Sequence, residues 1–515
     1  MKPLQKNIKE THYNFLFESV QLVSILKTRV SRVANAAIFF TLALIQIIIV
    51  SWISVSQERK SEYLDIQWIT QRYILGFYIS INPMADPRFT AILVALTAGL
   101  QLLLLAFLVN VVFSNKNMIQ IYPEPLYGPL YATEEAPLVE KTLNIVSQVS
   151  KKARIKVSKV FVYRKSVPNA FSLDLLPIPF FRKPYLVLNT NVLEILSDNE
   201  IEAVIAHELA HVKNSDSLIR LILSIPRLFL NLVYLFIYLQ IVTGILDALF
   251  DTLNLVIALE RIIFLGLVYL ILAIVTKVTV HFLSSANHQA EYLSDYFAAK
   301  LVGSDVLINS LIHLGQRSET MQVLSREIEW LSSLSEEKKV SSTFMRKVYQ
   351  RFPKTQLNED VAREIAPSLF LEEKFEELVT NYGIDLDVTT RSQLIKAAVP
   401  ALLERRSKYF ATAKDEETFE ADFTPSILKE KTIDWRRFDY NASQTLEKEE
   451  ISRFIATLIA QPDKMVFEHE LFQTAEKNSD HPSFRDRILT IYRIFHLKEY
   501  EEIVEEVAKE AKALT

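Results

Sequence analysis

Four stretches of hydrophobic residues dominate the pattern along the chain. The first two, residues 33–55 and 90–113, contain no charged residue. Each is longer than the roughly 20 residues that a helix needs to cross a bilayer. The first is also too long for the apolar core of a signal peptide, which spans about 7–15 residues. We therefore predict two transmembrane helices here, with a buried core helix as the alternative for each.

The third and fourth hydrophobic stretches, residues 221–245 and 262–282, are interrupted by a few polar positions. Pro226 and Arg227 lie near the start of the third, and Lys277 lies near the end of the fourth. Long basic side chains near a helix end can reach the headgroups of the bilayer. We predict a second transmembrane hairpin, with a buried or partly embedded hairpin as the alternative.

The distribution of basic residues predicts the orientation of these helices, because cytoplasmic flanks carry an excess of Lys and Arg. Six basic residues precede the first stretch, namely Lys2, Lys6, Lys9, Lys27, Arg29 and Arg32. The connection between the third and fourth stretches is acidic apart from Arg261. We expect the N-terminus, residues 114–216 and everything after 283 in the cytoplasm, although the four basic residues of loop 56–89 favour the opposite arrangement.

Composition narrows the class of protein further. The chain has 515 residues, of which only 8 are glycine, and this scarcity favours a mainly helical fold. The net charge of −4 gives no basic field for nucleic acid, so no nucleic-acid partner is expected. The absence of cysteine excludes disulfides, thiolate metal sites and cysteine nucleophiles.

The most specific local pattern is SDNEIEAVIAHELAHVKNSD. Ser197 followed by Glu200 forms a capping box, which predicts that a helix begins here. His207 and His211 are four residues apart, so a helix places both imidazoles on one face, where they can share a metal ion. Glu208 lies beside them, as a general base for zinc-activated water would. The alternative is a helix with two solvated histidines.

A catalytic zinc site needs a third protein ligand and one open position. The segment ANHQAEYLSDYFAAKL offers two candidates, Glu291 and His288, one turn apart. Asp295 follows Glu291 by one more turn, and an acid there could accept the second N–H of a histidine ligand. Spacing alone does not decide between the two candidate ligands.

Four ordered segments together resemble a known family. AHELAHVKNSD and EYLSD, with SVPNAFSL before them and HPSFRDRI near the C-terminus, are similar to the zinc metallopeptidases that include HtpX and the CAAX prenyl endopeptidases. The resemblance implies one zinc ion per subunit, with His207, His211 and Glu291 as its ligands. It also implies Glu208 as the general base, and so favours Glu291 over His288.

The resemblance implies supporting roles for further residues. Asp295 would orient a histidine ligand, and Asn214 and Asp216 would brace the zinc helix. His481 and Arg487 would lie near the cleft and stabilise the oxyanion that forms as water attacks the peptide carbonyl. The chain departs from the family at several positions, which concern the handling of substrate rather than the metal: Ser215, Asn287, His288, Gln289, Ala290 and Ser294.

Two segments before the zinc helix are typical of β-strands. KVFVYRKSVPNAF and PYLVLNTNVL are rich in β-branched and apolar residues, and LLPIPFFRKP separates them. An exposed strand edge containing Asn169, Ala170 and Phe171 would bind an extended substrate as an added strand. A plain hairpin with a buried aromatic side chain is the alternative.

The sequence after the proposed third ligand contains a long charged and helix-patterned region, 301–470. We interpret it as a helical subdomain whose charged faces are solvated, with a lid or a docking surface for a partner as the alternative. A C-terminal amphipathic helix follows. The expected organisation begins with an N-terminal segment (1–32), a first membrane hairpin (33–113) and the first part of the protease domain (114–216). A second membrane hairpin (217–283), the helix with the Glu ligand (284–300), the insertion (301–470) and the segment with the HP motif (471–515) follow.

The expected fold is therefore a mainly α membrane protein with about four transmembrane helices and a cytoplasmic α+β zincin-like protease domain with a small, edge-exposed β-sheet. The expected function is cleavage of membrane or membrane-proximal proteins in a bacterial cell membrane, with the active site facing the cytoplasm. Alternatives are a processing peptidase for a lipid-modified substrate, an inactive membrane adaptor and a peripheral soluble metallo-hydrolase.

Overall fold

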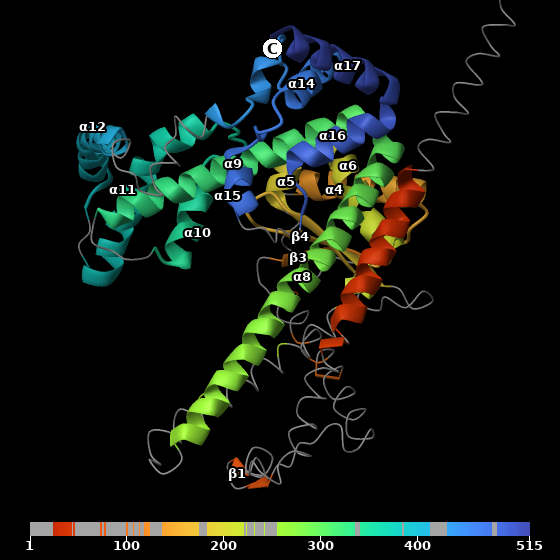
Figure 1. Cartoon of the computed structure of the whole chain (residues 1–515). Coiled ribbons are helices and arrows are strands. Elements are labelled where there is room, and N and C mark those ends of the chain that lie inside the picture. The colour runs from red at the N-terminus through yellow and green to blue at the C-terminus, as the bar shows by residue number, and fades with distance from the viewer. Residues whose placement is uncertain are drawn as a thin grey trace, which may run out of the picture. The chain divides into compact units, whose positions relative to one another are not determined.

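The structure is a computed structural model of the whole chain, and its ribbon is shown in Figure 1. The residues that it describes are 24–43, 45–46, 73–74, 77–78, 99–100, 103, 107, 113, 118–123, 136–174, 183–220, 223, 231, 242, 255–334, 340–383, 386–412, 430–475 and 481–514. The chain divides into two compact units. The first contains residues 1–25, 116–214 and 291–515, and the second contains residues 26–115 and 215–290.

A four-stranded sheet in the order β3-β4-β6-β5 lies in the first unit. Its strands are β3 (Met118–Tyr122), β4 (Lys159–Tyr163), β5 (Ala170–Asp174) and β6 (Pro184–Asn189). β4 and β6 are parallel, and the other neighbours are antiparallel. The central strand β6 is almost entirely buried, which explains its nearly continuous apolar sequence. The predicted strands are thus present, but the first of them is split into β4 and β5, which lie on opposite sides of β6.

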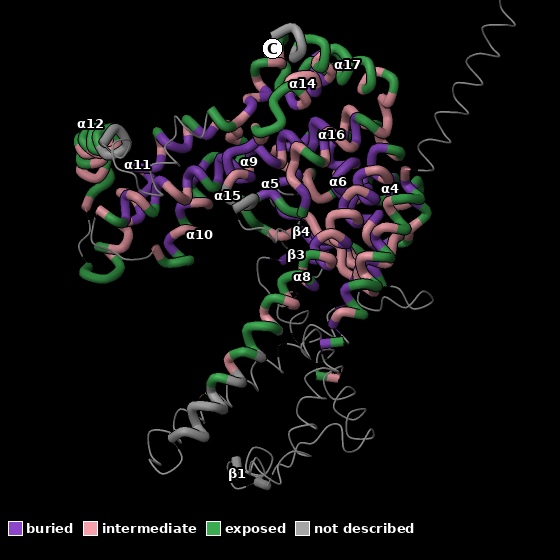
Figure 2. The backbone as a smooth tube through the Cα atoms, viewed as in Figure 1, coloured by how far each residue is buried: buried purple, intermediate pink, exposed green. Residues whose placement is uncertain are grey.

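Three helices pack around this sheet in sequence order. They are α4 (Ala136–Ala153), α5 (Thr190–Ile195) and α6 (Asp198–Lys213). Apolar residues of α6, including Ile201, Ile205 and Leu209, join Leu186 and Leu188 of β6 in one buried core. Figure 2 shows that α6 is buried along most of its length. A helix fixed in this way can hold catalytic side chains in place.

A 48-residue helix, α8 (Leu255–Val302), leads to α9 (Ser304–Ser333) through Gly303. The backbone of Gly303 has a φ of 106°, a conformation that residues with a Cβ rarely adopt. Seven further helices and one 3₁₀ turn complete the described C-terminal part. These are α10 (Ser342–Arg351), α11 (Glu359–Tyr382), α12 (Val388–Thr412), η4 (Trp435–Arg437), α14 (Lys448–Ala460), α15 (Glu468–Ala475), α16 (Phe484–Phe495) and α17 (Leu497–Leu514), with the short strands β1 (Tyr73–Ile74) and β2 (Phe77–Tyr78) in the second unit.

Helix α9 takes part in two hydrophobic cores. Leu307 and Leu311 in its first half belong to the core around the sheet. Leu324 and Ile328 in its second half belong to another core with α10 and α11. Figure 1 shows α10, α11 and α12 gathered near one end of α9. The region 301–470, which the sequence set apart as an insertion, therefore begins with a helix that is part of the core around the sheet.

Among the described residues, one helical segment has the length and composition to cross a membrane, Tyr269–Val302. It overlaps the fourth predicted span. Large apolar side chains just before and within it are exposed, for example Ile263 at 62% and Ile271 at 60%. Residues 44 and 47–55 of the first predicted span lie outside the described residues, as do the second and third predicted spans apart from isolated positions.

The second unit contains polar contacts between α8 and helical residues near the N-terminus. The amide of Gln46 donates to the Thr279 hydroxyl at 2.8 Å, and both side chains are buried. Arg32 and Asp216 form a buried ion pair at 2.6 Å. Asp216, which we expected to brace the zinc helix, therefore pairs with Arg32 within this unit.

Candidate metal centre

The N-terminus of α6 is capped as its sequence predicts. The backbone N–H of Ser197 donates to the Glu200 carboxylate at 2.8 Å, and α6 begins at Asp198. The capping box satisfies donors that the first turn of a helix leaves unpaired. At the other end of α6, the backbone N–H of Asn214 donates to the backbone oxygen of Ala210. The position of His207 within α6 is therefore fixed from both ends.

Glu200 also forms a buried pair that the sequence analysis did not predict. Its carboxylate lies 2.8 Å from the Nδ1 of His313 on α9. Burial raises the pKa of Glu200, but the contact with His313 outweighs burial and the pKa is lowered. Burial lowers the pKa of His313, but the contact with Glu200 outweighs it and the pKa is raised. The pair therefore favours the charged form of both residues.

This pair predicts a pH-dependent stability. The His313 contribution is complete below its unfolded pKa of about 6.5 and is lost as the pH rises through the higher folded pKa. The Glu200 contribution is present above about 4.5 and is lost as the pH falls through the lower folded pKa. We expect His313→Gln to lower the free energy of unfolding by about 1–3 kcal/mol near pH 5.5 and by less near pH 9.5. Thermal unfolding in detergent at both values measures this, and an equal deficit at both would contradict it.

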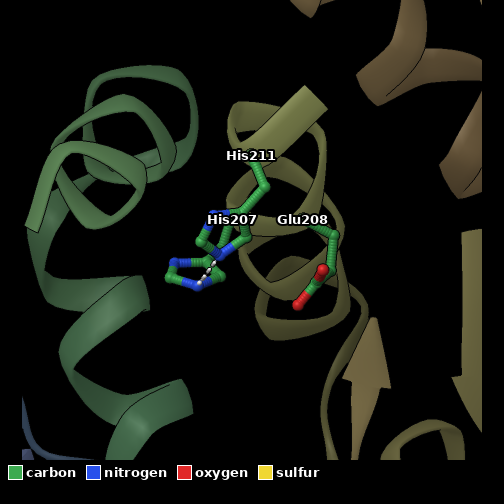
Figure 3. Close-up of side chains that lie close together, drawn as sticks. All are labelled: His207, Glu208 and His211. Atoms are coloured by element: carbon green, nitrogen blue, oxygen red, sulfur yellow. Dashed lines mark hydrogen bonds between the residues drawn. The ribbon is translucent and has the colours of Figure 1, made fainter. Parts of the chain in front are cut away.

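His207 and His211 bring their Nε2 atoms to within 3.2 Å of each other. Their ring centroids are 4.8 Å apart, and Figure 3 shows both rings on one side of α6 with Glu208 projecting beside them. The potential ligand atoms of His207, Glu208 and His211 all lie within 4.8 Å of one another. The i, i+4 spacing thus places the two imidazoles together on one face of α6, as the sequence predicts.

Glu291 of α8 completes a triangle of donor atoms. One of its carboxylate oxygens lies 3.3 Å from the His207 Nε2, and the other lies 3.6 Å from the His211 Nε2. In a tetrahedral zinc site with bonds of about 2.0–2.1 Å, two ligand atoms are about 3.3 Å apart. The two nitrogens and the carboxylate, whose side chain is almost fully buried, therefore fit a zinc ion.

Asp295 and Arg487 form a chain of contacts behind His207. The Nδ1 of His207 lies 2.9 Å from an Asp295 oxygen. The Arg487 guanidinium donates two hydrogen bonds to that carboxylate, at 2.8 and 2.6 Å. Burial lowers the pKa of His207, but its contacts with Asp295 and Glu291 outweigh burial and raise the pKa to about 10. The negative charge around the ring favours a bound cation.

His481 lies close to the same centre. Its Nδ1 is 3.2 Å from a Glu291 oxygen, and 65% of its side chain is exposed. Ser294 is a further neighbour, with its hydroxyl 3.2 Å from the His211 Nδ1. Each histidine of α6 thus has a polar partner on its second nitrogen. The sequence could have indicated Ser294 through its position three residues after Glu291 on the same helix.

A cavity of about 190 Å³ opens beside these residues. His207, Glu208, Glu291, His481 and Arg487 line it, together with Asn169 and Ala170 before and on β5. Because side chains alternate along a strand, Phe171 lies on the opposite face of β5 from Ala170. Ser172 shares the face of Ala170, and its hydroxyl donates to the backbone oxygen of Glu208 at 2.8 Å. Strand β5 is therefore held against the zinc-binding helix.

Comparison with known proteins shows which family this site is similar to. Residues 138–350 match "Peptidase family M48". The matched region is called the M48 region below. The M48 region includes α6, the Glu291 segment and α9, and it ends within α10.

Parts of the chain are similar to several curated proteases. A stretch of 95 residues is 37% identical to the Protease HtpX homolog of Thermodesulfovibrio yellowstonii, and 101 residues are 34% identical to Protease HtpX of Legionella pneumophila. A longer stretch of 133 residues is 33% identical to the Protease HtpX homolog of Sulfurihydrogenibium. These stretches cover 18%, 20% and 24% of this chain and only 31%, 35% and 40% of the relatives. No solved structure matches the chain. The resemblance predicted from the motifs is thus confirmed.

Proposed function

We propose that the protein is a zinc endopeptidase that cleaves membrane or membrane-proximal proteins. The observation that carries this proposal is the triangle of His207, His211 and Glu291 donor atoms, with edges of 3.2, 3.3 and 3.6 Å beside Glu208. The match to the M48 family supports the same conclusion for the reaction type. An inert adaptor would not require a base next to a triangle of ligands.

The proposed chemistry follows from the positions of these side chains. When bound, one zinc ion supplies a Lewis acid that polarises the peptide carbonyl and lowers the pKa of water. Glu208 accepts a proton from the attacking water and delivers it to the leaving amine nitrogen. His481, exposed at the cavity, is a donor for the oxyanion.

Arg487 and Asp295 support the zinc ligands in this proposal. Because the Nε and Nη2 of Arg487 both donate to Asp295, the contacts favour a role in fixing that carboxylate. Asp295 in turn accepts a hydrogen bond from the Nδ1 of His207, so the Nε2 of His207 is left to bind the metal. Arg487 also lines the cavity, and stabilisation of the oxyanion is the second role that we propose for it. We further propose that Asn214 and Asp216 brace the segment that ends α6.

Asp295→Asn tests the supporting role. The substitution keeps the shape of the side chain but removes the charge that pairs with Arg487, so we expect the zinc affinity to fall by about 10–100-fold. A zinc titration against a competing chelator measures this affinity. Asp305→Asn is the matched control, because Asp305 also contacts a histidine, His496 at 3.3 Å, but lies on α9 rather than on α8. Equal zinc affinities for the two variants would contradict the assignment.

Strand β5 provides a binding edge for an extended substrate. It is the last strand of the described sheet and is antiparallel to β6. The N–H of Asn189 donates to the carbonyl of Asn169, so by alternation the N–H and C=O of Ala170 and Ser172 point away from β6. A substrate strand that pairs with these groups would lie beside Glu208. Such main-chain pairing binds many sequences.

A membrane location is the second part of the proposal. The apolar surface of the segment Tyr269–Val302 and the three other apolar stretches of the sequence support a multi-pass protein of the cell membrane. The basic residues that precede the first hydrophobic stretch support an active site on the cytoplasmic side of the membrane. Retention in the membrane pellet after alkaline carbonate extraction is the expected result, and release into the supernatant would contradict it.

The endopeptidase reaction is tested by measuring the masses of the products. Purified protein in detergent, incubated with an unfolded membrane-protein fragment, should release internal fragments whose termini mass spectrometry identifies. A chelator should abolish their formation. Release of single terminal residues alone would overturn the endopeptidase proposal, and cleavage restricted to a lipid-modified fragment would favour the processing alternative. Capture of cellular proteins by Glu208→Gln would then identify the substrates.

A further inference from the structure

The cavity beside the candidate metal centre is lined by two chemically different sets of side chains. The charged or titratable set contains His207, Glu208, His211, Glu291, His481 and Arg487. The apolar set, called the apolar lining below, contains Pro168, Val192, Val204, Leu307, Leu311, Leu314 and Phe484. The volume of about 190 Å³ is an order of magnitude larger than the roughly 10–15 Å³ that holds one water molecule. There is space for a substrate side chain next to the reacting groups.

Helix α9 contributes three leucines to the apolar lining. Residues 307, 311, 314 and 318 recur at helical spacing and therefore share one face. Leu307 and Leu311 are buried in the core, whereas Leu314 and Ser318 are half-buried. Leu314 is thus the apolar side chain of α9 that a substrate in the cavity would contact.

A cluster of aromatic rings forms the neighbouring wall. Phe484 lines the cavity and packs edge-to-face against Phe467, with ring centroids 5.2 Å apart. His469 stacks on Phe467 at 5.5 Å and contacts Phe484 at 5.7 Å. Burial lowers the pKa of His469 to about 4, so this ring is neutral at physiological pH. The three rings of this wall are therefore uncharged at physiological pH.

Gly315 holds this cluster against α9. A Cβ atom at this position would collide with the ring of Phe467. The glycine therefore provides the space in which Phe467 packs, and Phe467 supports Phe484. Because interiors of this kind are close-packed, the wall formed by Phe484 cannot retreat freely to admit a different shape.

We propose that Leu314 and Phe484 form a subsite that selects a large aliphatic or aromatic residue next to the scissile bond. This inference rests on the proposed peptidase function and adds a preference to it. Main-chain pairing with β5 would bind any extended segment, whereas the subsite would select among the bonds within it. A charged side chain would lose its hydration against the apolar lining of the cavity and would be disfavoured.

A quenched fluorescent peptide library tests the subsite. Each of two central positions carries Leu, Phe, Met, Gly, Lys or Asp, and kcat/KM is measured for every peptide. For the unmodified protein we expect Leu, Phe or Met at one of the two positions to raise kcat/KM by at least about tenfold over Gly, Lys and Asp. Leu314→Lys should remove this preference and favour Asp. Leu378→Lys, which changes a leucine of α11 that is 37% exposed, should keep it.

A binding measurement separates the subsite from the chemistry. Fluorescence anisotropy records binding of the same peptides to zinc-loaded Glu208→Gln protein, with and without Leu314→Lys. If the library is bound with a Leu314-dependent apolar preference but never cleaved, the peptidase proposal fails and the subsite stands. If cleavage or binding shows the same preference with Leu and with Lys at position 314, the subsite is overturned. Gly315→Ala should weaken the apolar preference in both assays.

Discussion

Glu208→Gln is expected to lower the rate of peptide cleavage by about 10²–10⁴-fold while the protein keeps its zinc. The amide has nearly the shape of the carboxylate but cannot accept the proton of the attacking water. Glu208 lies beside His207 and His211 on the buried helix α6, so the substitution should leave the donor triangle intact. Cleavage of a fluorescent peptide and zinc content by elemental mass spectrometry measure the two effects on one sample.

The control for this variant is a glutamate on the exposed side of the same helix. Glu202 of α6 contacts Lys152 of α4 at 2.8 Å, on a part of the helix that precedes the histidines. Glu202→Gln should retain both zinc and cleavage. An equal loss of cleavage in the two variants would indicate a general effect on α6 rather than the loss of a base.

Glu291→Ala should abolish both zinc binding and cleavage. Loss of a direct ligand removes one corner of the donor triangle, so the zinc affinity should fall by more than the roughly 100-fold typical of supporting residues. It would also leave His481 without the carboxylate that it contacts at 3.2 Å. Zinc content after dialysis against a weak chelator is the measurement.

His288→Ala is the matched variant for this test, because His288 is the competing ligand on spacing alone. It lies one turn before Glu291 on α8. We expect His288→Ala to retain zinc and cleavage. Loss of zinc from His288→Ala together with its retention in Glu291→Ala would reverse the ligand assignment.

Local sequence patterns predict the features of this site that lie within one element. Ser197 and Glu200 predict the start of α6, because a capping box depends only on residues three apart. The pairing of His207 with His211 follows from helical periodicity in the same way. Glu291 could be chosen over His288 only through the family resemblance, since two residues one turn apart on a helix offer equivalent spacing.

Contacts between distant segments could not be predicted from the sequence. Arg487 and Asp295 are 192 residues apart, and no local pattern indicates that they form a bidentate pair. The same applies to Glu200 and His313, which join the cap of α6 to α9. These pairings depend on how whole helices pack, and packing is decided by many weak contacts together.

The position of α9 also differs from the expectation, because it too depends on how distant segments pack. Its charged sequence suggested the beginning of a separate solvated subdomain. In the structure, Leu307 and Leu311 are buried in the protease core, and Leu314 reaches the cavity. One buried face suffices to place a helix in a core, even when its other positions are polar.

The central claim, that the donor triangle holds one zinc ion that is required for cleavage, has one direct test. The purified protein is stripped with a chelator, zinc is added back in steps, and bound zinc and casein cleavage are measured at every step. We predict that cleavage is absent from the stripped protein, rises in proportion to bound zinc and reaches a plateau at one ion per chain. Full cleavage by the stripped protein, or no cleavage at one zinc ion per chain, would contradict the account.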